Sequence, residues 1–253
     1  MNTQKESKIK YLLDQHSQGT VLLPSWMESI GISRDLQKVY RKYGWLETIG
    51  TGAFKRFNEK ITWEGGLYAI QKEAELPIHP GGLTALSFQG LGHYVRMSEE
   101  MVYLFSQQKV ILPRWFLNYK WGAKVNYVQT SLLPENVGLT DFDLKTYSIT
   151  ISAPERAILE CLYLAPKEFD LMECYHLMEG LSNLRPKLVT ELLEKCSSVK
   201  VKRLFLFMAE KAQHQWFNYL DIKKIDLGTG DRSLAKGGTY NSKYGINIPK
   251  ELV

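Results

Sequence analysis

The stretch from Ser33 to Phe57 constrains the fold of this chain more than any other segment. Ser33 suits the N-cap of a helix, because its hydroxyl can accept a hydrogen bond from a free backbone N–H of the first turn. Gly44 can adopt the left-handed conformation that ends a helix. The sequence therefore predicts a helix between these two residues.

Two stripes follow the helical repeat within this segment. The apolar stripe predicts a buried face and consists of Leu36, Val39, Tyr40 and Tyr43. The opposite stripe has long, mostly cationic side chains and consists of Arg34, Gln37, Lys38 and Arg41. Such side chains can lie in a DNA major groove, where they reach both phosphates and base edges.

After Gly44 the pattern changes to that of a β-hairpin. Residues 45–49 and 53–57 predict two short strands, and the Gly50-Thr51-Gly52 turn can join them without steric cost. Two cations of the return strand lie where a wing would touch the DNA backbone: Lys55 and Arg56. A solvated helix followed by a surface hairpin is the alternative interpretation. The helix, the glycine stop and the basic hairpin together favour a DNA-binding module.

The positive charge of the chain is concentrated around this module. Residues 1–62 contain ten Lys and Arg against six Asp and Glu, a net charge of +4, whereas the remaining residues contain 22 against 21. A local positive excess is the electrostatic signature of a small nucleic-acid-binding domain. We therefore expect double-stranded DNA as a partner.

Composition excludes several other classes. No apolar run is long enough to span a bilayer, and the first residues lack the apolar stretch of a signal peptide, so we expect a cytoplasmic protein with no membrane partner. The three cysteines, Cys161, Cys174 and Cys196, are too widely spaced for a disulfide framework or a zinc site. We predict no metal and no cofactor.

The segments around this stretch predict a winged helix-turn-helix. Helical patterns at residues 3–17 and 24–30 precede Gly31-Ile32, a turn short enough for that motif. We predict two domains: residues 1–62 form the winged helix-turn-helix DNA-binding domain, and residues 63–253 form a larger mixed domain. The fold class is α+β, with a helical bundle portion in the larger domain.

In the larger domain, strands are predicted at residues 101–105, 125–130 and 147–151. Helices are predicted from Ser152, with a capping box to Glu155, and at residues 170–180, 184–196 and 198–210. Gly81-Gly82 could be an anion cradle or a site of close backbone packing. The basic cluster of Lys200, Lys202, Arg203 and Lys211 could be a solvated face or a contact surface. Tryptophans and tyrosines between residues 115 and 127 could stack on nucleotides or fill a core.

No catalytic signature is present. The chain lacks G-x-S-x-G, H-E-x-x-H, a Walker A loop and the kinase motif set, and its carboxylates are scattered. We therefore predict no catalytic residues and no enzyme activity. The glycine-rich segment of residues 225–240 keeps open a nucleotide-modifying or kinase-like function for the larger domain.

Six segments, in the same order, resemble the AbiEi-type antitoxins of bacterial type IV toxin–antitoxin systems. Residues 40–54 resemble the end of the recognition helix and the wing, and the others resemble motifs of the larger domain: residues 79–86, 152–160, 201–206, 225–232 and 237–240. The resemblance covers nearly the whole chain, which makes it more specific than any single motif.

The resemblance implies an abortive-infection antitoxin that binds inverted repeats in its own promoter and represses its operon. It implies that the larger domain counteracts a nucleotidyltransferase toxin without forming a stable complex, and that monomers in solution pair on DNA. The DNA-binding residues would be Ser33, Arg34, Gln37, Lys38, Arg41, Thr51, Lys55 and Arg56. A transcription factor whose larger domain senses a small molecule is a further alternative.

Overall fold

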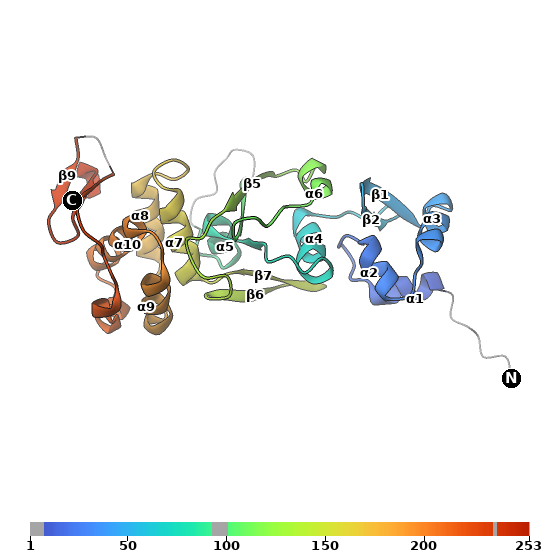
Figure 1. Ribbon diagram of the computed structural model, residues 1–253, viewed down its shortest axis with the longest axis horizontal. Coiled ribbons are helices and arrows are strands. Elements are labelled where there is room, and N and C mark those ends of the chain that lie inside the picture. The colour runs from blue at the N-terminus through green and yellow to red at the C-terminus, as the bar shows by residue number, and fades with distance from the viewer. Residues whose placement is uncertain (1–7, 93–100, 235–236, 253) are drawn as a thin grey trace.

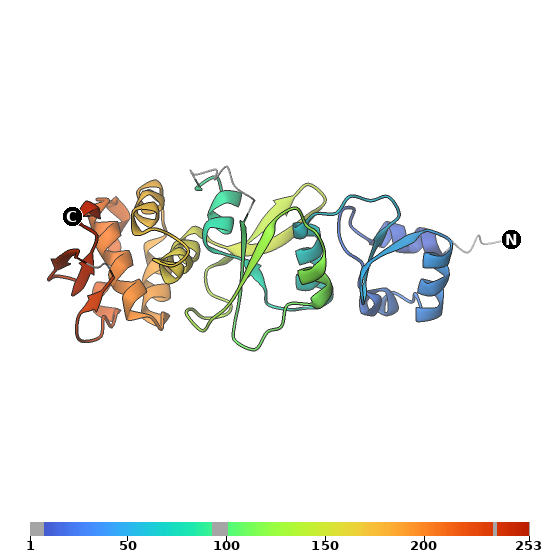
Figure 2. The same cartoon turned by 90° about the horizontal axis from the view of Figure 1, so that it is seen from above.

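A computed structural model describes residues 8–92, 101–234 and 237–252. The chain forms three parts in a row, with the N-terminal helices at one end and the last strands at the other (Figures 1 and 2). Part of the helix expected at residues 3–17 lies outside the described residues.

The N-terminal part has the element order of a winged helix-turn-helix. It consists of α1 (Lys8–Gln15), α2 (Pro24–Ser29), α3 (Arg34–Lys42), β1 (Leu46–Gly50) and β2 (Ala53–Arg56). The two strands pair antiparallel, and Leu22 adds a single bridge to Phe54. A small core holds these elements together through Leu12, Leu22, Met27, Ile32, Tyr40, Leu46 and Phe54.

Helix α3 begins and ends where the sequence predicts. The Ser33 hydroxyl accepts from the Leu36 N–H at 3.4 Å, and Gly44 follows the helix with φ of +73°. Asp35 in the first turn and the cations Arg41 and Lys42 in the last turn complement the helix dipole. Local chemistry therefore explains the bounds of this helix.

The buried stripe of α3 differs from the prediction. Tyr40 and Gln37 are buried and Leu36 is half-buried, whereas the Val39 and Tyr43 side chains are 42% and 70% exposed. Gln37 takes the place of Val39 and Tyr43 in the buried face, where its amide donates to the carbonyl oxygens of Pro24 and Ile32, at 3.1 and 3.0 Å. The helix is therefore rotated relative to the expected face, because the buried Gln37 amide bonds the carbonyl of Pro24, the first residue of α2, and that of Ile32 in the α2–α3 turn.

The central part combines short helices with two small sheets. It contains α4 (Trp63–Tyr68), the π-helical turn η1 (Ala69–Glu73), β3 (His79–Pro80), α5 (Gly82–Phe88), β4 (Met101–Ser106), α6 (Arg114–Asn118), β5 (Lys124–Gln129), β6 (Leu139–Leu144) and β7 (Tyr147–Ser152). Strand β4 lies between β3 and β5, antiparallel to the first and parallel to the second. Strands β6 and β7 form a hairpin, of which only β7 was expected.

The C-terminal part is the expected helical portion with a small sheet packed against it. Its elements are α7 (Pro154–Leu164), α8 (Leu171–Gly180), α9 (Pro186–Lys195), α10 (Val199–Lys211), η2 (Gln215–Tyr219), η3 (Ile222–Lys224), β8 (Arg232–Ser233), β9 (Thr239–Asn241), β10 (Ile246–Ile248) and η4 (Lys250–Leu252). One continuous hydrophobic core runs from the central part into this bundle.

The predicted capping box at the start of α7 is wrong. Ala153 is the N-cap and Pro154 opens the helix, with no side-chain cap. The Ser152 hydroxyl donates to Glu160 instead, and Glu155 accepts hydrogen bonds from Arg185. Both polar side chains are buried and serve tertiary contacts, which a local capping pattern does not reveal.

Hydrogen bonds and packing join the N-terminal and central parts. The Val21 N–H donates to the Gly65 carbonyl at 3.3 Å, the Leu23 N–H donates to the Glu73 carboxyl at 2.8 Å, and the Thr146 hydroxyl donates to the Gln18 carbonyl at 3.0 Å. The tip of the β1–β2 hairpin packs against α6, where a Cβ placed on Gly50 would lie 2.8 Å from the Trp115 Cβ. The N-terminal part is therefore held against the central part at both its helical and its hairpin side.

Candidate nucleic-acid interface

The exposed face of α3 carries four cations. Arg34, Lys38, Arg41 and Lys42 are all exposed. Arg34 forms an ion pair with Glu28 at 2.8 Å, and Lys38 forms one with Asp35 at 3.0 Å. Both pairs lie in solvent, where such interactions contribute about 1 kcal/mol or less, so DNA phosphates can replace the acidic partners.

The other two cations lie over aromatic rings. The Arg41 guanidinium carbon is 5.2 Å from the centre of the Phe54 ring, and the Lys42 Nζ is 6.0 Å from the Tyr43 ring. These contacts restrict the cations without neutralising them. Lys42 is a member of this face that the predicted stripe omitted, although its place in the last turn of a basic helix was a signal for it.

Gln37 does not share this face. Only 3% of the residue is exposed, and its amide nitrogen donates to two backbone carbonyls inside the N-terminal part. A side chain in this position cannot reach a base edge. Its expected groove-reading role is therefore corrected to a structural one that fixes the angle between α2 and α3.

Both cations of the hairpin, Lys55 and Arg56, contact other residues of the N-terminal part. Lys55 forms an ion pair with Glu47 at 2.8 Å and donates to the Glu59 carbonyl at 2.9 Å. Its hydrogen bond to Glu47 lowers the pKa of that carboxyl. Arg56 donates to the carbonyl oxygens of Leu13 and His16 on and after α1. Neither cation points freely into solvent, whereas Thr51 at the tip is exposed.

The structure thus brings part of the predicted set together. Ser33 caps α3 and lies exposed beside Arg34, while Lys38 and Arg41 follow on the same helix. Lys55 and Arg56 face the scaffold of the domain, because their neighbours supply acceptors that sequence spacing does not show. The candidate interface is centred on α3, with the hairpin tip beside it.

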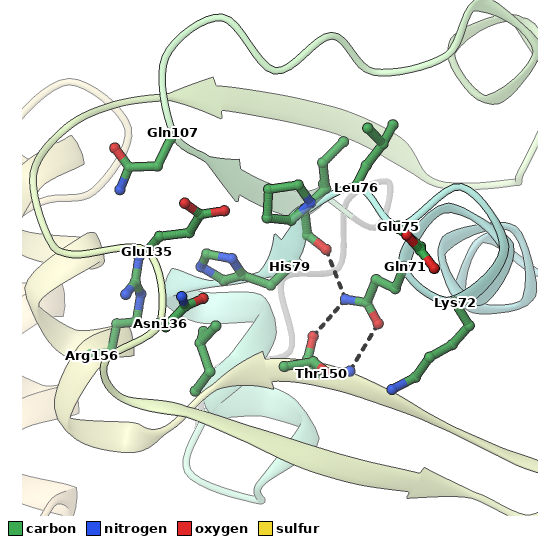
Figure 3. Close-up of a pocket in the computed structure, with 13 residues that line it drawn as sticks. Gln71, Lys72, Glu75, Leu76, His79, Gln107, Glu135, Asn136, Thr150 and Arg156 are labelled. Atoms are coloured by element: carbon green, nitrogen blue, oxygen red, sulfur yellow. Dashed lines mark hydrogen bonds between the residues drawn. The ribbon is translucent and has the colours of Figure 1, made fainter.

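A pocket of about 260 Å³ lies in the central part, away from α3 (Figure 3). Its wall includes the end of the α4–η1 helix, the chain leading into β3, and the loop before β6; the lining residues are Gln71, Lys72, Glu75, Leu76, Pro77, Ile78, His79, Gln107, Glu135, Asn136, Leu139, Thr150 and Arg156. The Gln71 amide donates to the carbonyl oxygens of Ile78 and Thr150 and accepts from the Thr150 N–H, which fixes this wall.

Behind the pocket, the buried carboxylate of Glu160 joins two of the sequence motifs. It accepts from His79 Nε2 at 3.2 Å, Arg156 Nε at 2.8 Å, the Gly82 N–H at 2.9 Å and the Ser152 hydroxyl at 2.8 Å. Burial by itself would raise the pKa of Glu160, but these hydrogen bonds and the Arg156 charge outweigh it and lower the pKa. Burial lowers the pKa of His79, which keeps the imidazole neutral.

The double glycine before α5 belongs to this network. A Cβ on Gly81 would lie 2.2 Å from a Glu160 carboxyl oxygen and 2.5 Å from the Phe105 ring. Gly82 has φ of +52° and gives its N–H to the same carboxylate. Close packing, rather than an anion cradle, therefore explains both glycines.

The glycine-rich segment after residue 225 wraps around Arg203 of α10. The buried guanidinium donates to the carbonyl oxygens of Leu227, Gly228, Gly230 and Gly245 at 2.6–3.1 Å. Lys202 donates to the Asp226 carbonyl, and Lys200 donates to the carbonyls of Tyr163 and Ala165 at the C-terminal end of α7. Inward-facing carbonyls bind cations and repel phosphates, so this loop does not have the geometry of a phosphate cradle.

The described part of the chain contains no group of three or more His, Cys, Asp or Glu side chains that could hold a metal ion. None of the helices in that part combines the length and apolar character needed to cross a bilayer.

Comparisons with known proteins identify the family. The sequence model described as "Transcriptional regulator, AbiEi antitoxin N-terminal domain" matches residues 5–97, and that described as "Transcriptional regulator, AbiEi antitoxin, Type IV TA system" matches residues 99–249. No curated protein matches the sequence. The fold is similar to the crystal structure of the RV2827C protein from Mycobacterium tuberculosis, with a TM-score of 0.57 and 12% identity over 94% of this chain and 88% of that chain. The chain belongs to the AbiEi antitoxin family, the transcriptional regulators of type IV toxin–antitoxin systems.

Proposed function

We propose that this chain represses its own operon by binding inverted repeats in the promoter through the exposed face of α3, and that it counteracts a nucleotidyltransferase toxin. The observation that carries the DNA-binding proposal is the group of exposed cations on α3, within a winged helix-turn-helix. Arg34 and Arg41 can each present a planar fork to guanine or phosphate. Lys38 and Lys42 supply charge to the phosphates on either side.

The proposal assigns one copy of the chain to each half of an inverted repeat. A monomer presents one α3, which fits one stretch of major groove. Two monomers therefore meet on DNA, and their spacing follows that of the half-sites. Ser33 and Thr51 add hydroxyl groups that can donate to phosphates at the helix start and the hairpin tip.

Replacing both arginines tests the assigned face. Arg34→Ala/Arg41→Ala should weaken binding to a promoter fragment by roughly 1–3 kcal/mol for each base contact that is lost. Fluorescence anisotropy measures the affinity, and thermal unfolding checks the fold. Lys187→Ala/Lys223→Ala is the matched control, because it removes two exposed cations from the C-terminal part. Wild-type affinity in the double arginine variant would contradict the proposal.

The larger domain acts on the toxin without catalysis in this proposal and without a stable complex. Support comes from the family and from the glycine-rich loop, which is occupied by Arg203. Mass spectrometry of the toxin after co-expression tests the absence of modification. Size-exclusion chromatography of the mixture tests the absence of a stable complex. A mass shift in the toxin would establish the enzymatic alternative.

A ligand-sensing regulator is the second candidate function, and the pocket favours it. Gln71, Lys72 and Glu75 line the pocket, while Glu73 in the same turn holds Leu23 of the DNA-binding part. A bound ligand could therefore shift the contact between the two parts. Thermal unfolding with ATP, GTP, CTP and UTP tests the nucleotide class of ligand, which should raise the unfolding midpoint if it binds. An unchanged midpoint with all four would exclude that class.

A further inference from the structure

The segment around α6 is rich in positive charge and has no opposing charge. Residues 101–134 contain Lys109, Arg114, Lys120 and Lys124 and no Asp or Glu. All four cations are exposed. Among the residues that the structure describes, none forms an ion pair with Arg114, Lys120 or Lys124, in contrast to the Arg34–Glu28 and Lys38–Asp35 pairs on α3.

This segment lies directly beside the hairpin tip of the DNA-binding part. The Gly50 backbone at the tip packs on Trp115 of α6, so closely that a Cβ there would lie 2.8 Å from the Trp115 Cβ. In Figure 1, α3 and α6 both lie along the upper edge of the molecule, on opposite sides of the β1–β2 hairpin. The segment that carries these cations therefore lies next to the hairpin, on the side away from α3.

Aromatic packing holds α6 in this place. Trp115 and Phe116 are buried, and the Trp121 indole N–H donates to the Phe116 carbonyl at 2.7 Å. A Cβ on Gly66 of α4 would lie 2.7 Å from the Trp121 ring. The aromatic residues of this segment thus form a core contact, and the cations lie exposed on its surface.

We propose that Arg114, Lys120 and Lys124 bind phosphates of DNA that flanks the segment contacted by α3. The proposal rests on the proposed DNA-binding function and extends it from the N-terminal part to the central part. Exposed cations beside the hairpin tip, with which none of the described residues forms an ion pair, suit the negative charge of a duplex backbone. Because lysines dominate and bind phosphates as point charges, the contacts should be independent of the flanking sequence.

Two DNA probes and two variants test the proposal. The short probe is a half-site of about 12 base pairs, and the long probe adds about 10 base pairs of random sequence on each side. The test variant is Arg114→Ala/Lys120→Ala/Lys124→Ala. The control variant, Lys167→Ala/Lys187→Ala/Lys223→Ala, removes the same charge from exposed positions in the C-terminal part. Thermal unfolding should show equal midpoints, because all six side chains are exposed.

The wild type and the control should bind the long probe at least about tenfold more tightly than the short one at low salt, and the test variant should lose this gain. The slope of log affinity against log salt on the long probe should become shallower by about 0.9 for each phosphate contact removed. Scrambling the flanks should change neither result.

The remaining outcomes overturn the proposal in distinguishable ways. If the wild type binds neither probe, the DNA-binding function itself fails and the flank contact fails with it. If the wild type binds and the test variant matches the control on both probes, only the flank contact fails. If the test variant matches the control on both probes and also no longer protects cells from the toxin, Arg114, Lys120 and Lys124 belong to a protein contact instead.

Discussion

At the scale of single residues, the Glu160 carboxylate of α7 joins the C-terminal part to the central part. Its two oxygens accept from His79, Arg156, Gly82 and Ser152, and only 1% of the residue is exposed. The motifs at residues 79–86 and 152–160 meet at this one side chain. Their resemblance to the family therefore reflects a shared scaffold as much as a shared activity.

Glu160→Gln should lower the free energy of unfolding by about 3–5 kcal/mol, because it leaves the buried Arg156 guanidinium without its counter-charge. Urea denaturation measures the loss. Glu191→Gln is the matched control: it removes an exposed carboxylate paired with Lys195 one helical turn away, and should cost less than about 1 kcal/mol. Equal losses in both variants would show that the hydrogen bonds of Glu160 stabilise the fold no more than an exposed ion pair does.

His16 makes the N-terminal part sensitive to acid. Burial, together with the nearby Arg56 charge, lowers the pKa of this imidazole to about 3. Nε2 contacts the Thr20 hydroxyl at 2.8 Å, and Nδ1 accepts from Arg56 Nε at 3.2 Å. The neutral ring is therefore the form that fits the folded state.

The folded-state pKa of His16 lies below the unfolded value of about 6.5, so the folded state loses stability as pH falls below 6.5. The expected loss is about 2 kcal/mol between pH 6.5 and pH 5, measured as the difference between wild type and His16→Gln in urea denaturation.

Glu73 makes a contribution to stability that changes with pH in the opposite direction. Burial raises the pKa of this carboxyl to about 8, so the folded state gains stability from it as pH falls below 8. Its contribution is common to both proteins and cancels in the comparison. A wild-type-minus-variant difference that stays constant from pH 7 to pH 5 would contradict the assignment to His16.

At the scale of elements, one arginine of α10 organises the glycine-rich segment and the last strands. Arg203 binds carbonyls at both ends of this segment, at Leu227 and at Gly245. Strands β8 and β9 lie between these two anchors in the sequence, and β10, the middle strand of the small sheet, begins directly after Gly245. Few large side chains lie in the loop of residues 226–232, so its conformation depends on the guanidinium that its carbonyls surround.

Arg203→Lys should speed hydrogen–deuterium exchange in residues 226–248 and lower the free energy of unfolding by about 3 kcal/mol, because one ammonium group cannot serve four carbonyls. Mass spectrometry of peptides from this segment reads the exchange. Arg232→Lys makes the same chemical change at a side chain that donates only to the neighbouring Asp231 carbonyl, and should leave exchange unchanged. Identical exchange in the two variants would contradict the anchoring role.

At the scale of the whole molecule, the cationic face of α3 and the helical C-terminal part lie at opposite ends (Figure 1). The N-terminal part has a small core of its own, and the larger core of the central and C-terminal parts also includes Val21, Leu23 and Ala53 of the N-terminal part. A change confined to the exposed face of α3 therefore leaves the packing of the larger domain intact. Repression and toxin neutralisation should accordingly be separable.

Lys38→Ala/Lys42→Ala, expressed from an unrelated promoter, should derepress a reporter placed behind the natural promoter and still protect cells from the toxin. Reporter output and colony counts measure the two activities in the same strain. Wild-type repression by this variant would count against the α3 face. Loss of protection at equal protein levels would show that the two activities share a surface.

The sequence by itself determined the elements whose causes are local. The cap at Ser33, the glycine stop at Gly44 and the hairpin turn at Gly50–Gly52 specify α3 and β1–β2, because each depends on backbone geometry within a few residues. The apolar repeats likewise predicted α8, α9 and α10. The α+β class and the family followed from the order of these signals.

Only the tertiary structure decided which polar side chains face solvent. Gln37 lies inward because the carbonyls of Pro24 and Ile32 accept from its amide. Arg56 turns to α1 because the Leu13 carbonyl accepts from its guanidinium. Glu160 and Arg203 are buried because residues distant in the sequence supply their partners. Periodicity assigns a residue to a face of its own helix, but the choice between a buried and an exposed polar group depends on acceptors that only folding brings close.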